Sequence, residues 1–283
     1  MKKRLTDILL ILIFVIGLSL LLYPTLSDYW NSFHQSRAIA SYAKEVANIG
    51  SDDYSLIWNS ATEYNKKLKT KENRFIMSDG EKDEYNSLLN ISGSGIMGYI
   101  EIPEINCSLP IYHGTDEAVL QIAVGHIEGT SLPTGGKGTH CVLSGHRGLP
   151  SAKLFSDLDK LAAGDVFTLR VLDEVLTYEV DQIRIVEPYQ VDDLEIAEGE
   201  DYCTLITCTP YGINTHRLLV RGRRIENLAG TATVRVTADA MRIEPLIVAP
   251  MAAVPMLLAL LCIVFIEDAY KKKSKKGGKS YEK

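Results

Sequence analysis

Closely spaced cysteine pairs are missing from this sequence of 283 residues, although it contains five cysteines. They are Cys107, Cys141, Cys203, Cys208 and Cys262, and no two lie closer than five positions apart. Zinc sites and dithiol redox motifs separate their cysteines by roughly two to four residues, so this spacing argues against both. Five cysteines are also too few for a disulfide scaffold. We therefore expect no metal, no cofactor and no disulfide framework.

Charged residues are missing from two long apolar runs, residues 8–23 and 246–266. Both are transmembrane candidates, and the second is long enough to cross the core of a bilayer. Pro250 and Pro255 interrupt the second run, but membrane helices tolerate proline when the freed carbonyls find other partners. The first run could also be a cleaved signal peptide. Its apolar core exceeds the usual ~7–15 residues and no small-residue cleavage site follows it, which favours an uncleaved anchor.

Basic residues flank the outer ends of both runs, with "MKKR" before the first and "KKKSKKGGK" after the second. The positive-inside rule then places both termini in the cytoplasm and the intervening chain outside. That chain carries 20 Lys and Arg against 32 Asp and Glu, a formal charge of −12. An acidic domain lacks the basic surface that nucleic acid requires, so we expect no nucleic-acid partner. The basic tail is a topology signal or a contact with anionic lipid.

Helical periodicity is confined to the first part of the intervening chain. Between Tyr54 and Leu68, apolar residues recur every three or four positions, which predicts a helix with one buried face. Aromatic residues at 30, 33 and 42 indicate another helix just after the membrane. The polar passage 69–87, "KTKENRFIMSDGEKDEYNS", predicts a loop or lid.

Short alternating or β-branched runs, separated by Gly, Pro, Asn and Asp, fill the chain from Gly98 onward. This pattern is typical of a barrel or a sandwich of many short strands. The runs are "YIEIP", "LPIYHG", "HCVLSGH", "VFTLRVL", "VLTYEV", "IRIVEP", "CTLITC" and "RLLVRGRRI". The fourth and fifth predict a hairpin that turns near Asp173 and Glu174.

Cys208 ends one of these runs and Arg217 lies in the next. A thiol attacks as its thiolate, and at a reference pKa near ~8.5 only a few per cent is ionised at neutral pH, so a base must lie nearby. His146 has the best context for this role, at the glycine-flanked end of "CVLSGHRG". Arg217 could present its guanidinium to the oxygen of a carbonyl under attack, a contact worth roughly 3 kcal/mol. Spacing allows a Cys/His/Arg site and equally allows a structural thiol.

Strand alternation separates these residues from their neighbours. His216 adjoins Arg217, and adjacent strand residues face opposite sides, so His216 points away if Arg217 points into the site. Cys203 lies five positions before Cys208 and faces the other way for the same reason. We expect the remaining thiols of this region to be core residues: Cys107, Cys141 and Cys203. We expect two further histidines to be hydrogen-bonded loop residues: His113 and His126.

Three segments of the chain resemble the segments that carry the cysteine, histidine and arginine of sortases, the membrane-anchored cysteine transpeptidases of Gram-positive bacteria. They are "TLITC", "LSGHRGLPSAKLF" and "TPYGINTHRLLVRGRR". The similarity runs from about residue 99 to Arg224, with "LPIYHGT" and "GGKGTH" in the expected order. A C-terminal span and an N-terminal helical extension resemble the class C, or pilus-polymerising, sortases.

The resemblance implies a mainly β fold: a closed eight-stranded β-barrel with an N-terminal helical extension, flanked by two transmembrane helices. It implies a cytoplasmic N-terminus (1–7), a signal-anchor (8–26), extracellular helices (27–69), a lid-like loop (70–97), the catalytic barrel (98–228), a linker (229–245), a second span (246–266) and a basic cytoplasmic tail (267–283).

The resemblance also implies a reaction. Cys208 attacks the Thr-Gly bond of an LPxTG-like sorting signal, His146 protonates the leaving amine, and a pilin lysine resolves the thioester while Arg217 stabilises the oxyanion. The implied partners are pilin subunits or surface proteins with such signals, at the membrane, and we expect the protein to act as a monomer. One alternative is a sortase that anchors surface proteins to a peptidoglycan precursor. Another is a non-catalytic membrane-tethered β-domain that binds a surface partner.

One departure from the class C pattern concerns the lid. Class C sortases commonly carry an Asp-Pro-aromatic motif that occupies the active site, whereas the corresponding stretch here, "NRFIMSDGEKDEY", has no such tripeptide. Phe75 and Tyr85 are the aromatic residues of this stretch that could fill the cleft instead.

Overall fold

The structure is a computed structural model that describes residues 2–91 and 93–227. The described residues fall into two compact units, 2–26 and 27–227. The predicted second span and basic tail lie outside the described residues, so they stay predictions. Among the described residues, one helical stretch, Leu10–Ala47, is long and apolar enough to cross a membrane by length and composition.

Three helices precede the barrel: α1 (Lys2–Ala47), α2 (Ser51–Lys69) and α3 (Asp79–Ser87). Helix α2 confirms the helix predicted from the apolar spacing of residues 54–68. Helix α3 lies within the passage predicted as a loop, so that passage is partly helical. Its start is a capping box: the Ser78 backbone N–H donates to Glu81 Oε2 at 2.8 Å, and the Ser78 side chain accepts from the Glu81 backbone N–H.

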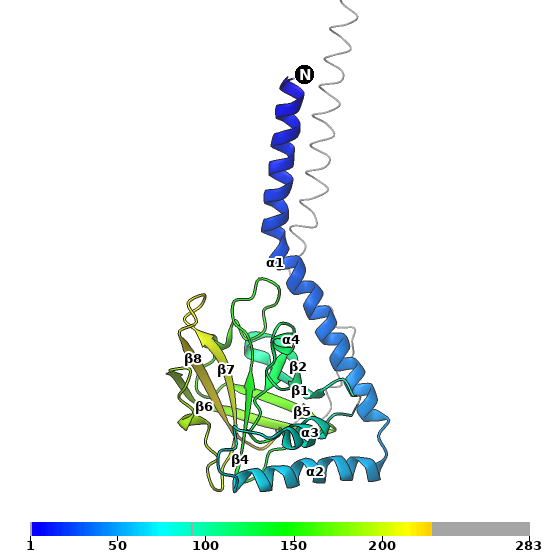
Figure 1. The fold of residues 1–283 in the computed structure, drawn as a ribbon, viewed down its shortest axis with the longest axis vertical. Helices are drawn as coiled ribbons and strands as arrows, with labels where there is room; N and C mark the ends of the chain where they lie inside the picture. The colour runs from blue at the N-terminus through cyan, green and yellow to red at the C-terminus, as the bar shows by residue number, and fades with distance from the viewer. Residues whose placement is uncertain (1, 92, 228–283) are drawn as a thin grey trace, which may run out of the picture. The chain divides into compact units, whose positions relative to one another are not determined.

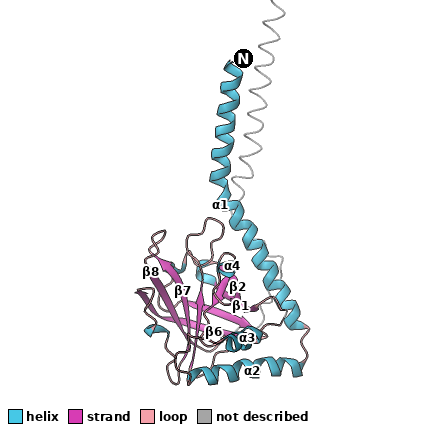
Figure 2. Cartoon of the chain, in the orientation of Figure 1, coloured by secondary structure: helices cyan, strands magenta, loops and turns pink. Residues whose placement is uncertain are grey.

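Eight strands close into a barrel in the order β1-β2-β3-β4-β7-β8-β6-β5 (Figures 1 and 2). They are β1 (Ile96–Ile102), β2 (Cys107–His113), β3 (Val124–His126), β4 (Thr139–Ser144), β5 (Val166–Val171), β6 (Glu174–Val186), β7 (Asp201–Thr209) and β8 (His216–Arg224). The connections include α4 (Glu117–Leu120) and three 3₁₀ turns, η1 (Pro103–Ile105), η2 (Leu158–Lys160) and η3 (Asp192–Leu194). This confirms a mainly β, closed eight-stranded barrel with an N-terminal helix.

The eight strands are not the eight runs that the sequence pattern indicated. "VLTYEV" and "IRIVEP" form one long strand, β6, whose pairing with β8 is interrupted between Val180 and Gln182. The missing strand is β3, three residues long and parallel to β2. Gly125 in β3 has no room for a side chain, because a Cβ there would lie 2.2 Å from the Gly114 carbonyl oxygen. The hairpin was predicted correctly, with Val171 of β5 opposite Glu174 of β6.

Helix α2 lies across one end of the barrel and α3 lies beside it (Figure 1). Tyr85 of α3 is fully buried, its hydroxyl lies 2.9 Å from His126 Nδ1, and it accepts a hydrogen bond from the Gly114 N–H at 3.0 Å. Burial raises the pKa of Tyr85 well above its usual range, so the phenol stays neutral. Tyr85 therefore fixes α3 in the core, and the interpretation that it could fill a cleft was wrong.

Candidate active site

Cys208 lies on the outer face of the barrel wall. Cys203 and Leu205 of β7 belong to the barrel core, whereas Ile206 packs in a separate cluster outside it. Because alternate residues of a strand face the same side, Cys208 shares the outer face with Ile206. Cys208 is partly exposed, whereas Cys203 is fully buried. The opposite orientation predicted for these two cysteines is therefore confirmed.

His146 lies two residues after the end of β4, the strand that pairs with β7. Strands β4 and β7 run parallel with Ser144 opposite Ile206, and the Gly145 N–H donates to the Ile206 carbonyl at 3.0 Å. The Thr207 hydroxyl donates to the Gly145 carbonyl at 2.8 Å. If this register continued for two residues beyond the end of β4, His146 would lie level with Cys208.

The backbone of His146 is held by the loop that follows it. The Phe155 N–H donates to the His146 carbonyl at 3.1 Å. Phe155 packs so closely on Gly145 that a Cβ there would lie 2.7 Å from its ring. The strand end therefore needs glycine just before the histidine.

Arg217 is the direct partner of Cys208 in the antiparallel pairing of β7 and β8. Residues directly opposite in antiparallel strands project to the same face, so the guanidinium and the thiol share one side of the sheet. Arg217 Nη1 donates to the backbone carbonyls of Asn214 and His216, at 3.3 and 3.1 Å. These bonds hold the head group at the β7–β8 turn. The register thus puts Cys208 and Arg217 on one face of the sheet, and β4, which leads to His146, lies beside them.

The other described thiols pack in or against the barrel core. Burial raises the pKa of the Cys107 thiol to about 12 and that of Cys203 well above its usual range. Cys141 pairs with Cys203 in the parallel register of β4 and β7, and both are buried inside the barrel. Among the described cysteines, Cys208 is the one that combines partial exposure with a neighbouring histidine and arginine.

One carboxylate faces the predicted base. Glu117 Oε2 of α4 lies 3.7 Å from His146 Nε2, and its other oxygen accepts a hydrogen bond from Gln121. Glu117 is largely exposed, so solvent screens this pair. Sequence spacing gave no sign of this carboxylate beside His146.

An apolar floor continues from the three residues along the outer face. Val142, Ile206 and Leu219, from β4, β7 and β8, form a buried cluster with Leu194 of η3. The segment that contains η3, residues 187–200 between β6 and β7, starts directly after Val186, which pairs with Arg217. This β6–β7 loop therefore borders the site, and its Leu194 packs on the apolar floor formed by Val142, Ile206 and Leu219.

His140 anchors the β6–β7 loop to the sheet. Its Nδ1–H donates to the Glu195 carbonyl at 2.8 Å, and its Nε2 accepts from the Thr204 hydroxyl at 2.7 Å. The pKa of His140 is lowered to about 4, because burial, and to a smaller extent the charges of Arg221 and Arg74, outweigh the Glu195 contact and Asp181, which raise it. The neutral imidazole fits both partners, so His140 is structural.

Acidification is expected to destabilise the fold through His140. Its folded pKa of about 4 lies below the reference value near 6.5, so the unfolded chain binds more protons between these values. This contribution is complete above about pH 6.5 and is lost as the pH falls toward 4, about 3 kcal/mol in all. Urea unfolding at pH 7 and 4.5 should show a smaller acid loss in His140→Gln than in wild type. His34→Gln, at an exposed site on α1, should lose as much as wild type.

The three other histidines of the barrel strands have partners of their own. His126 is fully buried in β3, and His113 Nε2 and Nδ1 lie 2.7 and 2.9 Å from the carbonyls of Leu88 and Gly95. His216 pairs with Thr209, one position from the Cys208 pair, and its Nε2 lies 3.4 Å from Glu187 Oε1. All three therefore have structural partners.

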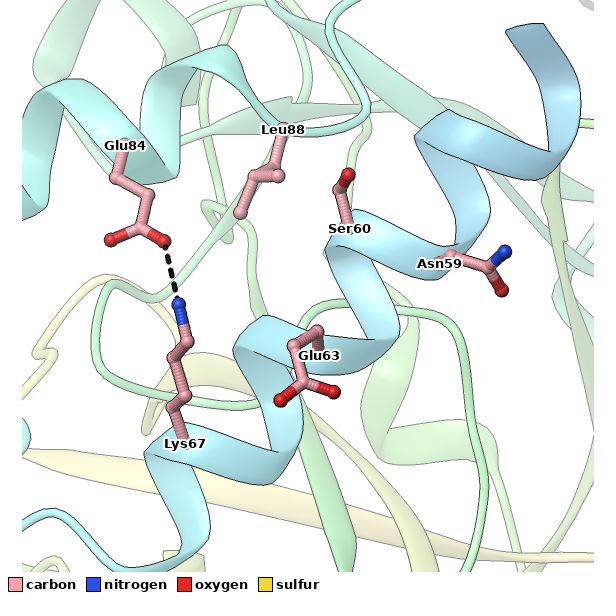
Figure 3. A pocket seen from close by; sticks show the side chains of 6 residues that line it. All are labelled: Asn59, Ser60, Glu63, Lys67, Glu84 and Leu88. Atoms are coloured by element: carbon pink, nitrogen blue, oxygen red, sulfur yellow. Dashed lines mark ion pairs between the residues drawn. The ribbon is translucent and has the colours of Figure 1, made fainter. Parts of the chain in front are cut away.

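A groove of about 530 Å³ lies away from these residues, between α2 and α3 (Figure 3). Lys67 and Glu84 form an ion pair across it at 3.5 Å. It is lined by Asn59, Ser60, Glu63, Lys67, Glu84 and Leu88. None of Cys208, His146 and Arg217 lines it, so it is separate from the candidate active site.

Comparison with protein families gives a match to the sortase domain over residues 100–225. Sortase D of Bacillus subtilis (strain 168) is 31% identical over 131 residues, which cover 45% of this chain and 63% of that protein. The chain therefore spans a little under two thirds of this curated relative.

Solved structures cover more of the chain. Sortase C1 from Streptococcus agalactiae is 57% identical, with a TM-score of 0.67 over 68% of this chain and 100% of that one. Sortase C from Streptococcus pneumoniae is 44% identical, with a TM-score of 0.60 over 68% of this chain and 97% of that one. The alignments thus cover 68% of this chain and almost the whole length of the two sortase C structures.

Proposed function

The chain belongs to the sortase family of cysteine transpeptidases, and on that premise we propose that it joins pilin subunits through a thioester on Cys208. The observation that carries the proposal is the register of β4, β7 and β8, which supports a site made of Cys208, His146 and Arg217. The class C neighbours support the pilin role, and the structure of the pneumococcal sortase C gives insight into that enzyme's pilin substrate specificity.

The first half of the proposed reaction cleaves an LPxTG-like sorting signal. The Cys208 thiolate adds to the carbonyl carbon of the threonine in the Thr-Gly bond. The C–N bond breaks, the departing glycine amine takes a proton from the His146 imidazolium, and the threonine carbonyl stays on Cys208 as a thioester. Arg217 donates hydrogen bonds to the oxygen that becomes negative during attack, a contribution of roughly 3 kcal/mol.

The second half transfers the acyl group to a lysine amine of a neighbouring pilin. The amine attacks the thioester carbonyl and gives a proton to His146, and the C–S bond breaks to release an isopeptide and the Cys208 thiolate. Water in place of the amine would give hydrolysis, so transfer requires the amine to reach the thioester first.

The proposed setting is the outer surface of a membrane. The N-terminal helix would anchor the chain, and a second span at 246–266 would return the basic tail to the cytoplasm. The barrel would then act outside the cell as a monomer.

Mass spectrometry of the full-length protein in detergent tests the proposal. An LPxTG-type peptide should form a thioester on Cys208, and a pilin domain with candidate lysines should convert it to an isopeptide product. Conversion by a peptidoglycan-precursor amine alone would instead indicate a surface-anchoring sortase. No adduct on wild type would overturn this substrate class and favour a non-catalytic binding domain.

A further inference from the structure

A buried arginine lies in the segment that the sequence pattern predicts to be a polar loop. The Arg74 side chain is 8% exposed, Nη1 lies 3.2 Å from Glu195 Oε2, and Nη2 donates to the Leu194 carbonyl at 2.9 Å. Its guanidinium also lies 4.8 Å from the centre of the Phe75 ring. Arg74 thus connects the N-terminal extension to the β6–β7 loop.

Both partners of Arg74, Leu194 and Glu195, belong to the β6–β7 loop. Leu194 packs on Val142, Ile206 and Leu219, and Ile206 lies two residues before Cys208 on the same face. The Glu195 carbonyl accepts the hydrogen bond from His140. The β6–β7 loop is therefore held by one hydrogen bond from His140 of the sheet and by two contacts from Arg74.

The segment that carries Arg74 is itself fixed. The Arg74 backbone carbonyl lies against Gly129, where a Cβ would approach the carbonyl oxygen to 2.4 Å, so the two backbones are in close contact. Lys71 Nζ lies 2.6 Å from Glu81 Oε1 in the capping box of α3. Hydrogen bonds from Lys71 and Ser78 lower the pKa of Glu81 to about 2, so this pair persists over the physiological pH range. Arg74 therefore extends from a rigid support.

Stability alone does not explain an arginine at this position. Removing a guanidinium from water is unfavourable, and an apolar side chain of similar length often fills such a site without loss of stability. The arginine Nε has no hydrogen-bond partner among the described residues, which adds to that unfavourable term. What arginine supplies and an apolar residue lacks is a directed N–H bond to the Leu194 carbonyl together with an ion pair to Glu195, the next residue of the loop.

We propose that Arg74 is a positioning residue that sets the β6–β7 loop against the apolar floor beside Cys208, and thereby sets the affinity for the substrate peptide. Arg74 does not touch the reacting atoms, so it should affect how substrate binds more than how it reacts. This inference rests on the proposed function for its kinetic readout. The loop position itself can be measured independently of activity.

Arg74→Met in the full-length protein tests the proposal. With an LPxTG-type peptide, KM should rise roughly tenfold, close to the lower limit for loss of one hydrogen bond to a charged group, while kcat changes less than about twofold. Hydrogen exchange of residues 192–197 should become faster. Arg184→Met is the matched control, because Arg184 pairs with Asp193 of the same loop at 2.8 Å but is 54% exposed. We expect it to resemble wild type in both measurements.

Glu195→Gln keeps the test decisive if Arg74→Met fails to fold. It weakens one of the two contacts and should raise KM and exchange in the same direction by a smaller factor. Unchanged KM and unchanged exchange in the variants that fold would overturn the proposal, as would a loss confined to kcat. If wild type does not process the peptide, the proposed function fails. Hydrogen exchange would then still decide whether Arg74 holds the loop.

Discussion

Cys208→Ala should abolish both cleavage of the sorting signal and transfer, with a loss of at least about 10⁴-fold in kcat/KM. No other described thiol can replace it. Cys141 and Cys203 lie inside the barrel, and desolvation of the partly buried Cys107 thiol raises its pKa to about 12. The measurement is intact-mass detection of the peptide thioester, together with the initial rate of product formation.

Cys107→Ala is the matched control for this experiment. Cys107 begins β2, and its sulfur lies 4.0 Å from the Leu154 carbonyl oxygen, so its loss removes a thiol without altering the three strands of the site. We expect wild-type rates and a thioester adduct. An adduct that survives in Cys208→Ala would show that another nucleophile does the chemistry, and the proposed role of Cys208 would be wrong.

The geometry around Cys208 could be predicted from sequence because it depends on strand alternation. In "TLITC" and "THRLLVRG", the period of two residues determines which side chains share a face. The structure adds the register: Cys208 opposite Arg217 in an antiparallel pair, and Ser144 opposite Ile206 in a parallel one. Parallel pairing of β4 and β7 joins segments about 60 residues apart in sequence, and no local pattern encodes that distance.

The strands themselves were harder to predict where local pattern and tertiary pairing disagree. The three-residue β3 has no alternation to detect, and it is defined by its pairing with β2 and by close contact between Gly125 and Gly114. Strand β6 was divided in two because polar residues interrupt its apolar pattern at Asp181 and Gln182. Strand β8 nevertheless pairs along both halves of it.

The contact between Arg74 and the β6–β7 loop could not be predicted from the sequence. Arg74 lies among Lys, Glu and Asn, a composition typical of solvent-exposed loops, yet it is buried against the β6–β7 loop. Charge in a polar run says nothing about burial, because burial depends on a partner about 120 residues away. Glu117, beside His146, was missed for the same reason.

Arg217→Ala should lower kcat/KM by about 10² to 10³-fold, which corresponds to loss of one preorganised donor to the oxyanion, roughly 3 kcal/mol. Arg217→Lys should recover part of this loss, since a lysine keeps the charge and lacks the planar fork. Arg223→Ala is the control. Arg223 lies six residues further along β8, about 20 Å away, and pairs with Glu200 at 2.9 Å. It should retain wild-type activity.

The division of the Arg217 effect between kcat and KM distinguishes two roles. Both of its backbone hydrogen bonds use Nη1, which fixes the head group before substrate arrives. A fixed donor aimed at developing charge acts in the transition state, so kcat should fall while KM changes little. A donor that only holds the ground-state peptide would raise KM and leave kcat unchanged. That result would move Arg217 from oxyanion stabilisation to substrate binding while leaving the thioester on Cys208 intact.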